Sequence, residues 1–244
     1  MQNRYAGDVG DFIKLGLLRH LARPVHAGGA GVRVGVNWYL TPDEAHNSDG
    51  KHVSYADPAN KWHASLSSCD PNLMRLMTLV LAGQRLVSRL EDVGSLAPGT
   101  ITFRAAVPSN GTDRGRWHLE ALDRLGDADL VFVDPDNGFR DVPPRSKAEK
   151  FALVDELRGY AQGGQALIAY HHADRSARLH DQAKSRLEQL SAAVDQQPVA
   201  TIIGHRGSSR FFVVTAPSSS ATEITDSLSK IADAWSPHVS RVHI

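Results

Sequence analysis

Apolar residues recur along this chain at two spacings, and these spacings divide it into helices and strands. Over residues 10–23 and 71–92 they recur every three or four positions, which predicts helices with one buried face. Continuous apolar runs over residues 32–40 and 129–134 predict strands that are buried on both sides. By the same criteria we expect further strands at 100–107, 164–172, 199–205 and 210–216, and further helices at 114–125, 146–161, 175–194 and 221–235.

The order of these elements predicts a single α/β domain that covers residues 1–244. Strands that alternate with helices form mostly parallel sheets with helices on both faces. Residues 206–209, which join the last two strands, are too few for a parallel crossover, so these strands should form an antiparallel hairpin. A mostly parallel sheet with a terminal antiparallel hairpin is the outline of a Rossmann-like domain of the class I methyltransferase type. An outline of this kind does not by itself determine function.

The segment that follows the first strand differs from the rest of the chain. Residues 41–70 are polar and rich in turn-forming types, and they precede the helix expected at 71–92. Loops longer than about 12–15 residues are usually functional or disordered. The aromatic residues Tyr55 and Trp62 favour a folded segment, so we expect a helical lid, inserted after the first strand, at about residues 41–95.

Composition excludes few classes of function. Lys plus Arg (27) equals Asp plus Glu (27), so the net charge argues neither for nor against a nucleic-acid partner. The single cysteine, Cys69, cannot form an internal disulfide. We see neither a signal peptide nor the roughly 20 consecutive apolar residues of a membrane helix, and therefore expect a cytoplasmic protein without a membrane partner.

Polar, aromatic and titratable residues gather where the predicted strands end. In open α/β sheets, ligands bind outside the carboxyl ends of the strands. Asp134-Pro135-Asp136-Asn137 stands at the end of the strand over 129–134, where a carboxylate can accept hydrogen bonds from an amino group or bind a metal. The other strand ends carry Asn37 and Tyr39, Tyr170 and His171, and Arg206.

A family resemblance begins at the N-terminus. Tyr5-Ala6-Gly7-Asp8-Val9-Gly10-Asp11-Phe12-Ile13-Lys14 resembles the His-Ala-Gly-Asn-x-Ala-Asp-x-x-Lys opening of the bacterial large-subunit ribosomal RNA adenine-N6 methyltransferases. The Asp-Pro-Pro-Tyr motif of that family falls at residues 134–137, its Tyr-containing strand end at Tyr170, and its Gly-Ser stretch at 207–209. The order of these features covers nearly the whole chain.

The resemblance implies an S-adenosylmethionine-dependent methyltransferase that acts on a base amine of a nucleic acid, with RNA favoured over DNA. Asp134 and the carbonyl of Pro135 would accept hydrogen bonds from the amine, and a base within a duplex would first have to flip out. The implied residue roles are catalytic for Asp134, Pro135 and Asn137, cofactor-binding for Gly7, Asp8, Asp11, Lys14, Asn37 and Tyr39, and substrate-binding for Phe139, Tyr170, His171 and Arg206.

The chain also departs from the family pattern. Trp38-Tyr39-Leu40 follows the first strand in place of a glycine-rich turn, which would let the backbone approach a cofactor closely. Leu15 stands where the family has a histidine, and Asp136 and Asn137 replace the second proline and the tyrosine of its motif.

Two other functions remain open at this point. A metal-dependent nuclease or phosphoesterase would hold Mg²⁺ or Mn²⁺ with Asp134, Asp136 and either His171 or its neighbour His172, and Arg206 and Arg210 would bind phosphate. A non-catalytic module would bind nucleic acid or protein through the lid and through the basic residues Arg140, Arg145, Lys147 and Lys150, with Trp38, Trp62 and Trp117 as candidates for stacking on bases. The sequence does not indicate an oligomeric state.

Overall fold

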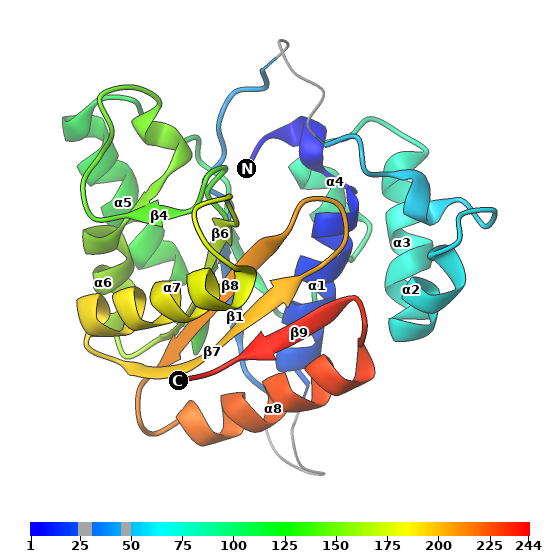
Figure 1. The fold of residues 1–244 in the computed structure, drawn as a ribbon. Coiled ribbons are helices and arrows are strands. Elements are labelled where there is room, and N and C mark those ends of the chain that lie inside the picture. Colours follow the sequence, from blue (N-terminus) through cyan, green and yellow to red (C-terminus); the bar gives the residue numbers. More distant parts are fainter. Residues whose placement is uncertain (24–30, 45–49) are drawn as a thin grey trace.

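The computed structural model describes residues 1–23, 31–44 and 50–244, and these form an α/β fold around one large sheet (Figure 1). The strand order in this sheet is β2-β1-β3-β6-β8-β7-β9. The strands, in that order, are β2 (Ile101–Phe103), β1 (Val34–Asn37), β3 (Leu130–Val133), β6 (Ala166–His172), β8 (Arg210–Ala216), β7 (Gln197–Gly204) and β9 (Val239–Val242).

The pairing of these strands confirms the mostly parallel sheet and the hairpin. The four strands β2, β1, β3 and β6 are parallel to one another. Strand β8 is antiparallel to both β6 and β7, so it lies between two strands that run in the opposite direction to it. Strand β9, which the sequence did not predict, adds an antiparallel edge next to β7.

Helices cover both faces of the sheet (Figure 1). One face packs against α1 (Val9–Leu21), α3 (Pro71–Leu81) and α8 (Ala221–Ala234), and the other against α5 (Gly111–Leu125), α6 (Val154–Gln162) and α7 (Leu179–Val194). Because successive strand residues point to opposite faces, Phe132 of β3 belongs to the first core and Val133 to the second. The fold is therefore compatible with the Rossmann-like class.

Helices α1 and α8 approach each other closely where α1 has a glycine. A Cβ atom on Gly16 would lie only 1.9 Å from the ring of Trp235, at the end of α8. The same tryptophan packs against Phe12, with ring centroids 5.5 Å apart. These contacts fix α1 on the sheet and so determine where its N-terminal end lies.

The segment between β1 and β2 contains short helices. They are the 3-10 helix η2 (Ser54–Ala56), α2 (His63–Cys69), α3 and α4 (Val87–Asp92), and residues 45–49 of the expected lid lie outside the described residues. Asp70 caps α3 by accepting a hydrogen bond from the backbone N–H of Leu73 at 2.8 Å, and Pro71 occupies its first turn. The helix expected over 71–92 is thus two helices, and a lid function for this segment stays a prediction.

The prediction of a helix at 146–161 is wrong for the first half of this range. This stretch instead forms the 3-10 helix η3 (Ala148–Lys150) and β5 (Ala152–Leu153), which pairs with β4 (Phe139–Arg140) in a small second sheet. The carboxylate of Glu156 accepts a hydrogen bond from the backbone N–H of Leu153 at 2.9 Å, so α6 starts only at Val154. None of the helices in the described ranges has the length and apolar character that crossing a membrane requires.

Candidate functional site

A cavity of about 440 Å³ opens at the carboxyl ends of β3 and β6. Its walls come from the N-terminal segment, the first turns of α1, residues 50–52, the turn after β3, the end of β6 and the turn between β7 and β8. The lining residues are Met1, Tyr5, Asp8, Gly10, Asp11, Lys14, Gly50, Lys51, His52, Asp134, Pro135, Asp136, Asn137, Tyr170, His172, Ala173, Ser208 and Arg210.

Strand β3 is followed directly by residues 134–137, here called the acidic turn, and all four of them line this cavity. All four residues of the strand are buried, and the ladder continues one step further because the backbone N–H of Asp134 donates to the carbonyl of Asn37 at 3.0 Å. The side chain of Asp134 is only 3% exposed. The turn therefore opens into a protected cavity, as its place at a strand end suggested.

The first turn of α1 is held by its own acidic residues. Asp8 is the N-cap and accepts a hydrogen bond from the backbone N–H of Asp11 at 3.0 Å. Asp11 in turn accepts one from the backbone N–H of Gly7 at 3.0 Å, and Gly7 has the positive φ of +83° that this tight turn requires. This arrangement orients Asp11 toward Lys14, one turn further along the helix.

Lys14 connects the first turn of α1 with the acidic turn after β3. Its Nζ atom lies 2.8 Å from Oδ1 of Asp11 and 2.6 Å from Oδ2 of Asp134. Burial opposes the charged form of this amine, but the two carboxylates outweigh burial and raise the pKa of Lys14. Burial raises the pKa of Asp11 to about 6, against the opposing effect of Lys14. Aromatic rings of Trp38 and Tyr170 surround the ammonium group at 5.7 and 5.8 Å.

A second ion pair holds Asp136. The N-terminal ammonium group of Met1 lies 2.7 Å from its Oδ1, and the amide of Gln2 donates to its Oδ2, also at 2.7 Å. Burial opposes ionisation of Asp136, but these two donors lower its pKa. The same ammonium group donates to the carbonyl oxygens of Asp134 and Tyr39, each at 2.9 Å. The N-terminal segment is thus fixed directly onto the acidic turn.

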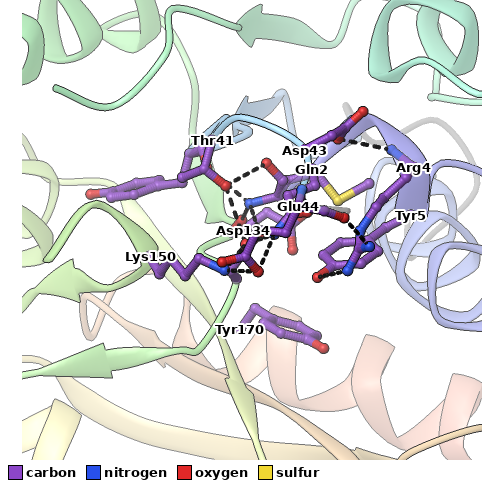
Figure 2. Close-up of polar contacts among 12 residues, drawn as sticks. Gln2, Arg4, Tyr5, Thr41, Asp43, Glu44, Asp134, Lys150 and Tyr170 are labelled. Carbon is purple, nitrogen blue, oxygen red and sulfur yellow. Dashed lines mark hydrogen bonds and ion pairs between the residues drawn. The ribbon is translucent and has the colours of Figure 1, made fainter. Parts of the chain in front are cut away.

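Glu44 ties three segments together beside the cavity (Figure 2). Its carboxylate contacts Lys150 and Lys147, and its backbone N–H donates to the side chain of Gln2 at 3.0 Å. Hydrogen bonds with the lysines lower the pKa of Glu44 to about 2. Two of the basic residues that the binding-module hypothesis assigned to a partner therefore already contact Glu44 within the chain.

Arg210, the first residue of β8, also lines the cavity and is 4% exposed. Its Nη2 atom donates to Oγ of Ser208 at 3.0 Å, and its Nη1 atom is 3.7 Å from Oδ1 of Asp8. Its Nε atom is buried and has no partner among the described residues. From the sequence, we expected Arg210 in the site only as a phosphate ligand under the nuclease hypothesis.

Several residues implied by the resemblance lie outside the cavity. Asn37 is fully buried behind it and donates to the hydroxyl of Tyr160 at 2.9 Å. Tyr39, with a φ of +43°, points its hydroxyl toward Glu156 at 3.1 Å. Gly7 does not line the cavity, and its carbonyl accepts a hydrogen bond from Tyr55 at 3.1 Å.

The two neighbouring histidines at the end of β6 point to opposite sides. His172 lines the cavity, with its Nε2 atom 3.1 Å from the hydroxyl of Tyr170. His171 instead packs against Phe139, with ring centroids 5.0 Å apart, and burial lowers its pKa to about 3. The cavity therefore contains His172 in place of the expected His171 and Phe139.

Arg206 also lies outside the main cavity, where it stacks on the ring of Trp62. Its guanidinium group is 3.8 Å from the ring centre of Trp62, and its Nε atom donates to Nδ1 of His238 at 2.7 Å. It lines a second cavity of about 210 Å³, which has His52 in common with the first.

The residues in place do not favour the metal hypothesis. Within residues 1–23, 31–44 and 50–244, no group of three or more His, Cys, Asp or Glu side chains is arranged to bind a metal ion. Asp134 and Asp136 each contact a cation of the chain itself. His171 lies outside the cavity, and His172, which lines it, contacts the hydroxyl of Tyr170. The chemistry available in the cavity is hydrogen bonding and charge pairing by fixed carboxylates, ammonium groups and a guanidinium group.

Comparison with known proteins found no protein-family model that matches the chain and no significant match among curated proteins. A functional assignment therefore depends on the site itself.

Proposed function

We propose that the protein transfers a methyl group from S-adenosylmethionine to an amine of a nucleic-acid base, with RNA favoured over DNA. One observation carries the proposal. The turn that begins with Asp134 and Pro135 faces the same cavity as Asp8, Asp11 and Lys14, and Lys14 contacts Asp134 directly. These are the two segments in which the sequence resembles base-amine methyltransferases.

The cavity suits a cofactor of this size and charge. Its volume of about 440 Å³ lies within the range of roughly 300–1,000 Å³ typical of small-molecule sites. The buried Nε atom of Arg210, which lacks a partner among the described residues, is a donor that an anionic group of a ligand would satisfy. Asp8, Asp11, Lys14 and Arg210 would hold the cofactor. Asn37 and Tyr39 would instead support the turn and the N-terminus, because their carbonyls accept hydrogen bonds from the backbone N–H of Asp134 and from the ammonium group of Met1. The bound cofactor supplies an electrophilic methyl group on a sulfonium ion.

The residues of the acidic turn would position the target amine. Lys14 contacts Oδ2 of Asp134, so Oδ1 is the oxygen that would accept a hydrogen bond from the amine. The carbonyl of Pro135 would accept the second, and two such bonds aim the nitrogen lone pair at the methyl group. Asn137 lines the cavity beside them, where the resemblance places a residue that contacts the base.

The order of the strands is consistent with this proposal. An antiparallel strand next to parallel ones belongs to the outline of class I methyltransferases, and β8 takes such a place between β6 and β7. A shared outline supports the proposal without deciding it.

A surface beside the cavity suits single-stranded nucleic acid. Trp62 is 37% exposed, with Arg206 at 3.8 Å and Lys61 at 5.1 Å from its ring centre. Stacking rings combined with positive charge are the usual means of binding single strands. Because His52 lines both cavities, a strand that lies across Trp62 would lead toward the acidic turn.

Methyl transfer from labelled S-adenosylmethionine to RNA and DNA oligonucleotides tests the proposal. We expect Asp134→Asn to lower the rate at least about 100-fold while the far-ultraviolet circular dichroism is unchanged. Asp129→Asn is the matched control, because Asp129 lies exposed at the other end of the same strand. Wild-type rates in Asp134→Asn, or no transfer by the wild type to either nucleic acid, would contradict the proposal.

A further inference from the structure

Arg210 is a buried cation whose hydrogen-bonding capacity is not filled by residues 1–23, 31–44 and 50–244. A guanidinium group carries five N–H donors, and burying it is costly unless they find acceptors. Arg210 is 4% exposed, and it donates to the hydroxyl of Ser208 at 3.0 Å. Its ion-pair partner Asp8 is 3.7 Å away, and its Nε atom is buried without a partner among the described residues.

The first turn of α1 leaves room for the guanidinium group of Arg210. A Cβ atom on Gly10 would lie 1.2 Å from Nη1 of Arg210, so any larger residue at position 10 would displace the guanidinium group. Gly10 also belongs to the N-terminal end of α1, where backbone N–H groups carry partial positive charge. The guanidinium group of Arg210 is therefore packed against the first turn of α1, next to its ion-pair partner Asp8.

Two other cations of the cavity, Lys14 and the N-terminal ammonium group of Met1, have closer partners. Lys14 lies 2.6 and 2.8 Å from two carboxylates, and the ammonium group of Met1 lies 2.7 Å from a third. An anionic group of a ligand would therefore gain more by contacting Arg210 than by contacting either of these two, since the carboxylate partner of Arg210 lies beyond hydrogen-bond distance.

We propose that Arg210 and Ser208 form an anion subsite that binds the carboxylate of the methionine part of S-adenosylmethionine. The inference rests on the proposed function for the identity of the ligand. A carboxylate accepts two parallel hydrogen bonds from a guanidinium group, which fixes both its position and its orientation. The subsite thereby sets which end of the cofactor lies against α1 and which faces the acidic turn.

Calorimetric titration with S-adenosylmethionine and with its decarboxylated form tests the subsite. We expect the wild type to bind the decarboxylated form about 10- to 100-fold more weakly, which is the usual effect of losing a charge-assisted contact. Arg210→Gln removes the guanidinium group, and Gly10→Ala displaces it without removing its charge. Both variants should bind S-adenosylmethionine about 10- to 100-fold more weakly than the wild type and should no longer distinguish the two ligands.

Arg19→Gln is the matched control, because Arg19 is a largely buried arginine of α1 whose ion pair with Asp70 lies outside the cavity. It should bind both ligands as the wild type does. Equal wild-type affinity for the two ligands would overturn the subsite, and this comparison does not depend on any variant folding. Full discrimination retained by both Arg210→Gln and Gly10→Ala would overturn it as well.

Titration with inorganic phosphate separates this inference from the proposed function. If the wild type binds phosphate but not S-adenosylmethionine, and Arg210→Gln abolishes phosphate binding, the anion subsite stands with a different ligand and the methyltransferase proposal fails. If S-adenosylmethionine binds with an affinity that is independent of Arg210, the subsite fails and the proposed function stands. Absence of binding to either ligand would overturn both.

Discussion

The Nζ atom of Lys14 lies 2.6 Å from Oδ2 of Asp134, although the two residues are 120 positions apart in the chain. This contact joins the N-terminal helix to the turn after β3 and places both in one cavity. Everything proposed for the site depends on that junction.

Replacing Lys14 with methionine should strongly destabilise the fold. The change leaves Asp11 and Asp134 buried without their shared cation, and breaking a buried ion pair from one side typically costs about 3–5 kcal/mol. Urea unfolding measures the effect. Lys184→Met is the control, because Lys184 is half exposed and its pair with Glu188 should contribute under about 1 kcal/mol. Equal effects of the two changes would show that the junction is not structurally important.

Asp11 should make the protein less stable as pH rises through the weakly acidic range. Its pKa is raised from 3.8 to about 6 by burial, so between these values the folded protein holds a proton that the unfolded chain has released. The free energy of unfolding should therefore fall with rising pH, by at most about 1.4 kcal/mol per pH unit. Asp11→Asn should remove this contribution, which urea unfolding at a series of pH values measures. An unchanged pH dependence in the variant would contradict the raised pKa.

His171 should have the opposite effect to Asp11 and make the protein more stable as pH rises. Burial lowers its pKa from 6.5 to about 3, so below pH 6.5 the unfolded chain takes up a proton that the folded protein does not. Stability from this residue is present above pH 6.5 and is lost as pH falls toward 3, again by at most about 1.4 kcal/mol per unit. His171→Gln should be less sensitive to acid than His180→Gln, in which an exposed histidine is replaced. Identical acid sensitivity of the two variants would argue against a buried neutral His171.

Trp62→Ala should weaken binding of single-stranded RNA about 5- to 100-fold, because one stacked base contributes roughly 1–3 kcal/mol. Fluorescence anisotropy with a labelled oligonucleotide measures the change. The affinity for S-adenosylmethionine should stay the same, since Trp62 does not line the main cavity. Leu79→Ala, which removes another exposed apolar side chain of the insertion, is the control. RNA affinity that is equal in the two variants would remove Trp62 from the proposed surface.

Periodicity predicted most of the large elements, and it failed where tertiary contacts decide the local structure. Residues 146–161 have helical spacing, but the backbone N–H of Ala152 donates to the carbonyl of Gly138 at 3.0 Å and so holds this stretch in an extended conformation. Strand β9 was missed because only Val239 and Val242 of its four residues are buried. A run this short becomes a strand only when it pairs with β7, which local sequence does not reveal.

The candidate site was predictable in its strand ends but not in the directions of its side chains. Alternation along β6 requires His171 and His172 to point to opposite faces, but the sequence does not say which face holds the cavity. Asn37 and Tyr39 lie at a strand end as expected. Their side chains point into the protein interior, where they form hydrogen bonds with Tyr160 and Glu156. Such partners lie more than a hundred positions away, so no local pattern indicates them.

Thermal unfolding in the presence of S-adenosylmethionine is the most direct test of the central claim. A ligand that binds only the folded state at 100 times its Kd adds about 2.7 kcal/mol of stability, so the melting temperature of the wild type should rise clearly. An unchanged melting temperature at millimolar S-adenosylmethionine, together with a rise on addition of Mn²⁺, would contradict the account and favour a metal-dependent site.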